Sequence, residues 1–332
     1  MFRRIIIAAI CVLLLLPALI GTSVDNGKEH KSKNDKPIPH GHAVLWREPK
    51  DIGSRNLYLG PGGEKMMPDL SHVTLIEKEK GGYSTKYRVR DGSGREWVVK
   101  AGKEAQSETA ASRLMWGVGY NSDVNYLVPN VRVEGLDKPL QNVRFSARPK
   151  DVKRVDGFKW KDNPFVGSRE FQGLKVMMAL MNNWDIKDSN NKILVVKDKN
   201  GKNELQYEVH DLGGSFGKVS HLPRFLQFKP DRNNPKAYAQ SHLVDKVKDG
   251  DVRLHYSVKR SDLFKHISAD DARWLGGLVS RLSQRQLEDA FRSANYTTDQ
   301  VRLMTEAVRK RAAELNQLPT NSQLAKRTAR SH

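Results

Sequence analysis

Two motifs decide the fold: Asn183-Trp184-Asp185-Ile186-Lys187-Asp188-Ser189-Asn190-Asn191 and Glu208-Val209-His210-Asp211-Leu212-Gly213-Gly214. Between them lie two strand-like runs, 192–197 and 205–210, joined by a polar turn that contains Asn200-Gly201. An Asn-Gly dipeptide between two such runs is a strong hairpin signal. Because a hairpin brings its outer ends together, we expect Asn190 and Asp211 to be neighbours, with Asp185 one tight loop away. Two carboxylates and an amide at one end of a sheet provide the oxygen ligands that a hard cation prefers.

A second group of polar residues precedes these motifs. Strand-like runs cover 72–77, 83–90 and 96–100, and the turn signal Asp91-Gly92-Ser93-Gly94 separates the last two. In such a hairpin Lys100 lies beside Gly81 and Gly82. Glycines let the backbone approach a phosphate closely, and a lysine at the same end supplies a point charge. The pattern therefore predicts a phosphate-binding site at Gly81, Gly82 and Lys100.

The segment after Lys100 has the spacing of a helix. Apolar residues recur through 104–119, and Gly117 and Gly119 mark its end. Glu104 and Glu108 are four residues apart and share one helix face. Either carboxylate is placed to pair with Lys100 and to fix its ammonium group.

The remaining elements define the fold class. Strands over 126–133 and 141–147 complete an antiparallel five-stranded first lobe, and an amphipathic helix over 169–182 leads into the Asp185 loop. Helices are then predicted over 269–282, 283–294 and 298–318, each preceded by a Ser, Thr or Asp cap. Segment 218–257 has little periodicity. We expect an α+β fold with one helix in the first lobe and a mainly helical second lobe.

These motifs carry a resemblance. Asp185-x4-Asn190 followed by Asp211-Leu212-Gly213 resembles the catalytic loop and metal-binding triplet of the protein-kinase-like superfamily. Trp97-Val98-Val99-Lys100 resembles the kinase strand that ends in the phosphate-binding lysine. Glu108-x5-Leu114, followed by Gly-Tyr and Val-Pro, looks like the corresponding helix of bacterial HipA kinases and phosphatidylinositol kinases, so we prefer Glu108 to Glu104 as the partner of Lys100.

The resemblance implies a two-lobed fold and an ATP- and Mg-dependent phosphotransferase. Asp185 would be the catalytic base, with Asp188 as the second candidate. Asn190 and Asp211 would hold Mg²⁺. Lys100, supported by Glu108, would contact the ATP phosphates beneath the glycine loop of Gly81 and Gly82. The chain departs from the pattern at three points: Asn183-Trp184 replaces the usual His-Arg or Tyr-Arg pair, Leu212 replaces an aromatic residue, and the glycine loop is degenerate.

Composition limits the class of partner. The 332 residues carry a formal net charge of +19, with 38% hydrophobic and 29% charged residues, which indicates a soluble protein with polar tails and an acidic partner. A nucleotide, an unknown phospho-acceptor, or an anionic envelope or lipid surface fits this charge. No basic stripe interleaved with aromatic residues is present, which disfavours nucleic acid.

The N-terminus predicts export. Arg3-Arg4 precede the apolar run Ile5–Leu16, and small residues follow at Gly21-Thr22-Ser23, as in a signal peptide over 1–23. We expect an extracytoplasmic protein, periplasmic or secreted. The alternative is a membrane anchor over 5–20, although this run is shorter than the ~20 residues of a typical span. Cys11, the only cysteine, lies inside the run, so no disulfide-linked partner is expected.

The predicted organisation is a signal peptide (1–23), a polar tether and irregular extension over the first lobe (24–71), a first lobe (72–148), a second lobe (149–318) with an activation- or substrate-binding segment (218–257), and a basic tail (319–332).

Two other functions stay open. Because extracytoplasmic space holds little ATP, the chain is alternatively an inactive pseudokinase that binds an anionic partner through its basic surface. A metal-dependent hydrolase using Asp185, Asp188 and Asp211 is disfavoured, because only His210 accompanies them.

Overall fold

The computed structural model describes residues 38–79, 85–155, 157–219, 231–258, 260–320 and 323. The predicted signal peptide, Gly81 and Gly82, and nearly all of the basic tail lie outside these residues. In the described part of the chain, no helix combines the length and apolar character needed to cross a membrane.

The first lobe is built on a five-stranded sheet with the order β2-β3-β4-β6-β5. All neighbouring strands in it are antiparallel, which confirms the prediction. The strands are β2 Thr74–Glu79, β3 Lys86–Arg90, β4 Glu96–Ala101, β5 Asn125–Val131 and β6 Leu140–Ala147. Their register places Lys100 opposite Lys86 on one side and Arg144 on the other.

The β3–β4 turn is organised by the buried carboxylate of Asp91. This group accepts hydrogen bonds from the Ser93 amide (3.0 Å) and hydroxyl (2.7 Å) and from the Arg95 amide (2.9 Å). It also accepts from the Asp69 amide (3.1 Å) and from the indole Nε1 of Trp97 (2.9 Å). A single side chain therefore holds the turn, the preceding extension and the core of the sheet together.

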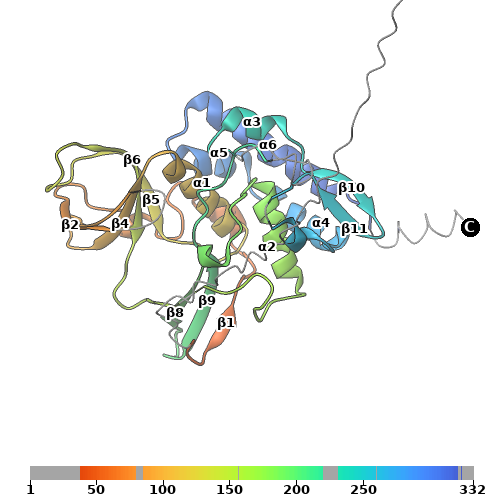
Figure 1. The fold of residues 1–332 in the computed structure, drawn as a ribbon, viewed down its shortest axis with the longest axis horizontal. Coiled ribbons are helices and arrows are strands. Elements are labelled where there is room, and N and C mark those ends of the chain that lie inside the picture. Colours follow the sequence, from red (N-terminus) through yellow and green to blue (C-terminus); the bar gives the residue numbers. More distant parts are fainter. Residues whose placement is uncertain are drawn as a thin grey trace, which may run out of the picture. The chain divides into compact units, whose positions relative to one another are not determined.

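Helix α1, Lys103–Gly117, joins the first sheet to the second lobe. Its residues Ala110, Leu114 and Met115 are buried in the large hydrophobic core that the second-lobe helices also share. The Gln106 side-chain amide donates to the carbonyls of Ala294 (3.1 Å) and Asn295 (3.0 Å). Figure 1 shows α1 between the first sheet and α5. A second, smaller core, which includes Trp97 and Phe145, lies in the first lobe.

The second lobe contains a four-stranded sheet with the order β1-β9-β8-β7. Its strands are β1 His42–Val44, β7 Lys153–Val155, β8 Asn191–Lys197 and β9 Asn203–Val209. The β8–β9 hairpin predicted from Asn200-Gly201 is confirmed, and its register runs from Asn191 opposite Val209 to Lys197 opposite Asn203. Gly201 has φ +75°, a conformation that glycine adopts at little cost.

The extension before the first lobe is more ordered than the sequence indicates. Strand β1 pairs in parallel with β9 of the second lobe, and two short 3-10 helices follow, Ile52–Ser54 and Glu64–Met66. The Gln286 side chain donates to the carbonyls of Ile52 (2.7 Å) and Arg55 (2.9 Å). The extension therefore also packs on the second lobe, whereas the sequence placed it over the first.

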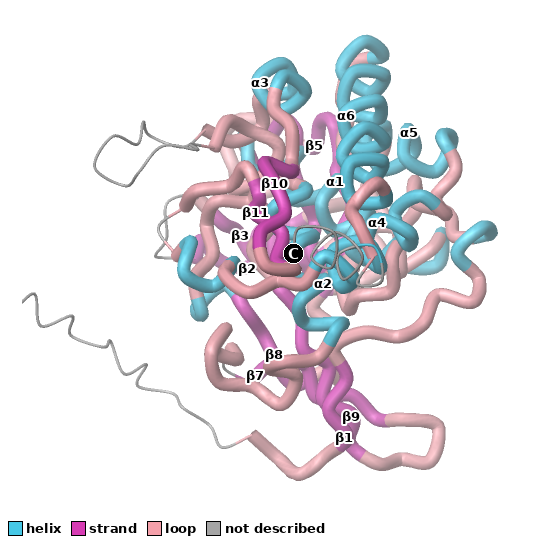
Figure 2. Tube along the Cα trace, turned by 90° about the vertical axis from the view of Figure 1, so that its right-hand side faces the viewer, coloured by secondary structure: helices cyan, strands magenta, loops and turns pink. Residues whose placement is uncertain are grey.

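Figure 2 shows the helices of the second lobe in cyan. Their first turns are capped by side chains. Ser168, Ser268, Ser283 and Thr297 each accept a hydrogen bond from a first-turn amide, as expected of cap residues. The helices are α2 Arg169–Leu180, α4 Ala269–Ser280, α5 Gln284–Arg292 and α6 Thr298–Asn316. The weakly periodic segment contains α3 Pro235–Gln240, β10 Val244–Lys248 and β11 Asp251–Leu254, and a 3-10 helix, Ser261–Phe264, follows it.

Asp91→Ala should destabilise the protein by about 2–4 kcal/mol, because it leaves buried donors without an acceptor. Burial raises the pKa of Asp91, but the hydrogen bonds from Ser93, Trp97, Arg95 and Asp69 outweigh burial and hold its pKa below the usual value. A depressed pKa gives stability that is present above about pH 4 and is lost as the pH falls through the folded value. Urea unfolding of both proteins at pH 7 and pH 3 measures the effect.

The control for this substitution is Asp137→Ala, at an exposed position. It should change the free energy of unfolding by no more than about 0.5 kcal/mol. Equal effects of the two substitutions, or a difference between wild type and Asp91→Ala that does not shrink in acid, would contradict the role of the Asp91 carboxylate.

Candidate active site

The β8–β9 hairpin brings the two polar motifs side by side. The 3-10 helix Asp188–Asn190 leads directly into β8, and one residue, His210, separates the end of β9 from Asp211. The Asn190 carbonyl accepts hydrogen bonds from the His210 amide (2.8 Å) and the Asp211 amide (3.2 Å). The amide side chain and the carboxylate, separated by twenty residues of sequence, thus start from adjacent points of the backbone.

Asp185 is held in a tight loop directly after α2. Its amide donates to Asn183 Oδ1 (3.0 Å), and the Asn190 Nδ2 donates to its carbonyl (2.7 Å) and to its Oδ2 (3.2 Å). Lys187 Nζ lies 2.7 Å from Asp185 Oδ1. The Asp185 carboxylate is therefore fixed next to Asn190, while the amide oxygen of Asn190 is not used in these bonds.

Lys100 connects the first lobe to these motifs. It lies on β4, is only 2% exposed, and its Nζ lies 3.8 Å from Asp211 Oδ1. On its other side, Nζ lies 2.6 Å from Glu104 Oε2 and 3.4 Å from Glu108 Oε2. A buried ammonium group requires such partners, because an unpaired charge in the interior is strongly disfavoured. One side chain therefore contacts both lobes.

Both glutamates considered from the sequence contact Lys100, so the preference for Glu108 alone does not describe the site. Glu104 is the nearer of the two and also pairs with Arg232 of the second lobe. Glu108 is buried and also pairs with Arg144 on β6. Each glutamate therefore bridges Lys100 to an arginine. Neither arginine could be identified from the sequence, because both pairs depend on contacts between distant segments.

The charge of Asp211 is maintained by its neighbours. Burial alone raises the pKa of Asp211, but the positive charges of Lys100 and Arg144, together with the Gly213 amide and His210, outweigh burial and lower that pKa. The Gly213 amide lies 3.2 Å from Asp211 Oδ1. Asp211 is therefore ionised at neutral pH, as a cation ligand must be.

Asp188, the second candidate for the base, has a different environment. Its Oδ1 accepts a hydrogen bond from the Trp160 amide (2.9 Å) and lies 3.0 Å from Arg260 NH1. These contacts tie the Asp188 loop to the segment before α2 and to the residue that precedes the 3-10 helix Ser261–Phe264. Asp188 is therefore engaged in holding the loop, whereas Asp185 lies beside Asn190.

A further ionic cluster that the sequence did not reveal lies behind Asp211. Asp123, in the loop before β5, is 5% exposed and lies 4.0 Å from Arg148 and 3.7 Å from Arg154. Burial raises the pKa of Asp123, but His210 and the surrounding arginines outweigh it and lower that pKa. Since Arg148 follows β6 and Arg154 lies on β7, the cluster fixes the segment that connects the two lobes.

A cavity of about 310 Å³ lies beside this connection. Trp97, Arg148 and Pro149 are among the residues that line it. Side chains alternate between the two faces of a strand, so Trp97 and Lys100 project from opposite faces of β4. The cavity is therefore on the wrong face of the sheet to share a ligand with Lys100.

The described elements form a two-lobed α+β fold, as the sequence predicts. An antiparallel five-stranded sheet with one helix carries Lys100, and a mainly helical lobe carries the hairpin flanked by Asn190 and Asp211. The segments that carry Asp185, Asn190 and Asp211 come from the second lobe, and Lys100 comes from the first.

No protein-family model and no curated protein matches the sequence. The structure is similar to the Helicobacter pylori proinflammatory kinase CtkA, with 11% identity and a TM-score of 0.43, covering 79% of this chain and 97% of that one. It is also similar to Rio2 kinase from Chaetomium thermophilum in an ADP/Mg²⁺-phosphoaspartate complex, with 11% identity, a TM-score of 0.32 and coverage of 74% and 72%. The maize SIRK1 kinase domain bound to AMP-PNP has 15% identity, a TM-score of 0.20 and coverage of 74% and 94%.

Arg144→Met should destabilise the protein by about 3–5 kcal/mol, because it removes one partner of the buried Glu108 carboxylate and leaves a like-sized apolar group in its place. Chemical denaturation with both circular dichroism and fluorescence as probes measures the loss.

The matched control is Arg88→Met, which removes the exposed Arg88–Glu77 pair (3.6 Å) on the same sheet. Such a surface pair contributes about 1 kcal/mol or less. If Arg144→Met costs no more than Arg88→Met, the Glu108–Arg144 contact does not stabilise the fold.

Proposed function

We propose that the protein is an ATP- and Mg-dependent phosphotransferase of atypical kinase-like type. The observation that carries the proposal is the convergence of Lys100 and Asp211 across the two lobes, with a distance of 3.8 Å between Nζ and Oδ1. An ammonium group opposite a carboxylate is the arrangement needed to hold a phosphate on one side and a phosphate-bound cation on the other.

The donor set fits Mg²⁺. The Asp211 carboxylate, kept ionised by its neighbours, and the amide oxygen of Asn190 are hard oxygen ligands from adjacent points of the backbone. Mg²⁺ is typically held by one or two protein oxygens, with waters and substrate phosphates filling the other positions. When bound, the ion neutralises negative charge on the phosphate oxygens.

The residues of this chain would position the reactants. Lys100, fixed by Glu104 and Glu108, would contact the nucleotide phosphates. Asp185 would accept the proton of the acceptor hydroxyl, and Asn190 and Lys187 orient its carboxylate. General-base catalysis of this kind contributes about 10²–10⁴ in rate. Gly81 and Gly82 would cover the phosphates, although they lie outside the described residues.

We further propose that the protein acts outside the cytoplasm, on the basis of the signal-like segment 1–23. We also propose that it is related to the HipA-like and phosphatidylinositol-kinase-like proteins, on the basis of the motif around Glu108.

The second candidate function is that of a pseudokinase. Asn183-Trp184 in place of the usual His-Arg or Tyr-Arg pair favours it. Nucleotide binding without phosphate transfer would identify this alternative.

Mg-ATP should raise the melting temperature of the wild type, because a ligand that binds only the folded state stabilises it by mass action, by about 2.7 kcal/mol at one hundred times Kd. Lys100→Met and Asp211→Asn should lose this shift. Lys103→Met, at an exposed position at the start of α1, should keep it. Each variant is compared with its own ligand-free melting temperature. No shift in the wild type would reject nucleotide binding, and equal shifts in all four proteins would reject the site.

Asp185→Asn should reduce phosphate transfer by about 10²-fold or more while the Mg-ATP melting shift is retained, because the base acts on the acceptor and not on nucleotide binding. Asp188→Asn should reduce stability more than catalysis. ADP release and autophosphorylation measure the rates without a known acceptor. If Asp188→Asn lost more phosphate-transfer activity than Asp185→Asn while both variants were equally folded, Asp188 would be the base instead of Asp185.

A further inference from the structure

Two histidines and an aspartate converge at one end of the β10–β11 hairpin, outside the site described above. His242 precedes β10, Asp245 lies within it, and His255 follows β11. We propose that His242, Asp245 and His255 form a binding site for a transition-metal ion of the Zn²⁺ type.

The distances between the three side chains fit a shared ion. Asp245 Oδ1 lies 3.0 Å from His242 Nε2 and 2.8 Å from His255 Nδ1. The imidazole rings are 3.9 Å apart between centroids, and one ligand atom from each residue lies within 4.8 Å of the others. Zn²⁺ bonds of about 2.0–2.1 Å in a tetrahedral site separate ligand atoms by about 3.3 Å. The two histidine–aspartate distances are therefore about 0.3–0.5 Å shorter than this spacing.

The backbone explains why the three side chains meet. The β10–β11 register shifts between Val244 and Lys246, which makes Asp245 the irregular residue of its strand. Such bulges change the direction of a side chain relative to the regular alternation. The amide of His255 donates to the Leu243 carbonyl (2.8 Å), so the segments that carry the two histidines are hydrogen-bonded to each other.

The same segment is anchored to α6, which limits its motion. Glu314 Oε2 accepts hydrogen bonds from the Leu243 amide (2.7 Å) and the Val244 amide (2.9 Å). Ser241 Oγ lies 2.6 Å from the buried Arg311 guanidinium. A metal site requires ligands that are held before the ion arrives, and these contacts fix the backbone on either side of His242.

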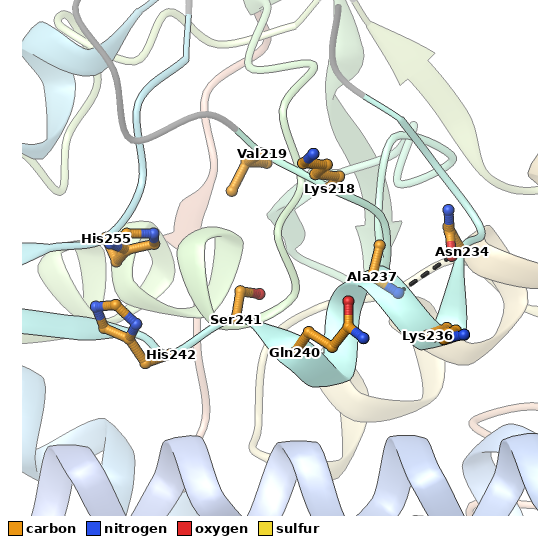
Figure 3. Close-up of a pocket in the computed structure, with 9 residues that line it drawn as sticks. All are labelled: Lys218, Val219, Asn234, Lys236, Ala237, Gln240, Ser241, His242 and His255. Carbon is orange, nitrogen blue, oxygen red and sulfur yellow. Dashed lines mark hydrogen bonds between the residues drawn. The ribbon is translucent and has the colours of Figure 1, made fainter. Parts of the chain in front are cut away.

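The open side of the cluster borders a cavity of about 530 Å³. His242 and His255 lie together at one side of it, and Lys218 and Lys236 also line it (Figure 3). Three protein ligands leave a coordination position for water or another group. Because two lysines and no acidic residue are among the described residues that line the cavity, an anionic group is the class of molecule that would complete the coordination.

The ligand type selects the metal. Imidazole nitrogens favour Zn²⁺, Co²⁺, Ni²⁺ or Cu²⁺ over Mg²⁺, which prefers oxygen ligands. The site is therefore distinct in chemistry from the Asn190–Asp211 pair. Asp123, Glu208 and His210 also bring ligand atoms close together. That cluster is a poorer candidate for a cation because three arginines, Arg144, Arg148 and Arg154, influence the same carboxylate of Asp123.

The test is Zn²⁺ titration by calorimetry on chelator-treated, tag-free protein, with Co²⁺ absorption as a spectroscopic readout of nitrogen ligands. The wild type should bind one Zn²⁺ at this site, and its Co²⁺ complex should show visible absorption bands. His255→Gln, His242→Gln and Asp245→Asn should each weaken Zn²⁺ binding by about tenfold or more and reduce the Co²⁺ bands. Each variant is checked for folding by circular dichroism.

The matched control is His266→Gln. His266 Nδ1 lies 3.0 Å from Oδ2 of Asp251, the first residue of β11, so it forms a similar histidine–aspartate pair. His266 does not belong to the three-residue cluster. This variant should bind Zn²⁺ as the wild type does. Absence of stoichiometric binding in the wild type, or equal binding by all four variants, would overturn the proposal. Neither result depends on nucleotide binding or phosphate transfer.

Discussion

The structure depends on the buried ammonium group of Lys100. A charge that is 2% exposed must be matched by opposite charges nearby. Glu104 and Glu108 supply them from α1, and Asp211 approaches from the hairpin of the second lobe. Since α1 also packs on the second lobe through Gln106, the position of the helix is constrained by both its ionic and its apolar contacts.

The ionic cluster around Lys100 is balanced, and this limits what it can bind. Three cations, Lys100, Arg144 and Arg232, face three anions, Glu104, Glu108 and Asp211. Adding a divalent cation alone would leave excess positive charge next to Lys100, and adding a phosphate chain alone would leave excess negative charge next to Asp211. The two together disturb the balance less than a phosphate chain alone, because the cation neutralises part of the phosphate charge. The cluster is therefore better suited to a metal–phosphate complex than to either component by itself.

Local signals in the sequence predicted the elements that local chemistry decides. The Asn-Gly turn predicted the β8–β9 hairpin, apolar spacing predicted the long helices, and Ser and Thr caps predicted where several of these helices begin. Pairing between distant segments left no such signal. Strand β1 is three residues long and pairs in parallel with β9, so it has no usable periodicity. Arg144 and Arg232 similarly acquire their roles only through contacts with α1.

The same physical reason separates the two candidate sites. The residues flanking β8–β9 could be paired from the sequence because the strands alternate regularly and the turn between them is recognisable. The β10–β11 hairpin has short strands and an irregular register at Asp245, and its turn, around Asp249 at φ +53° and Gly250, follows a charged run instead of an apolar one. Periodicity is lost at the bulge that directs Asp245 toward the two histidines. The irregularity that hides the hairpin in the sequence is therefore the feature that assembles the cluster in the structure.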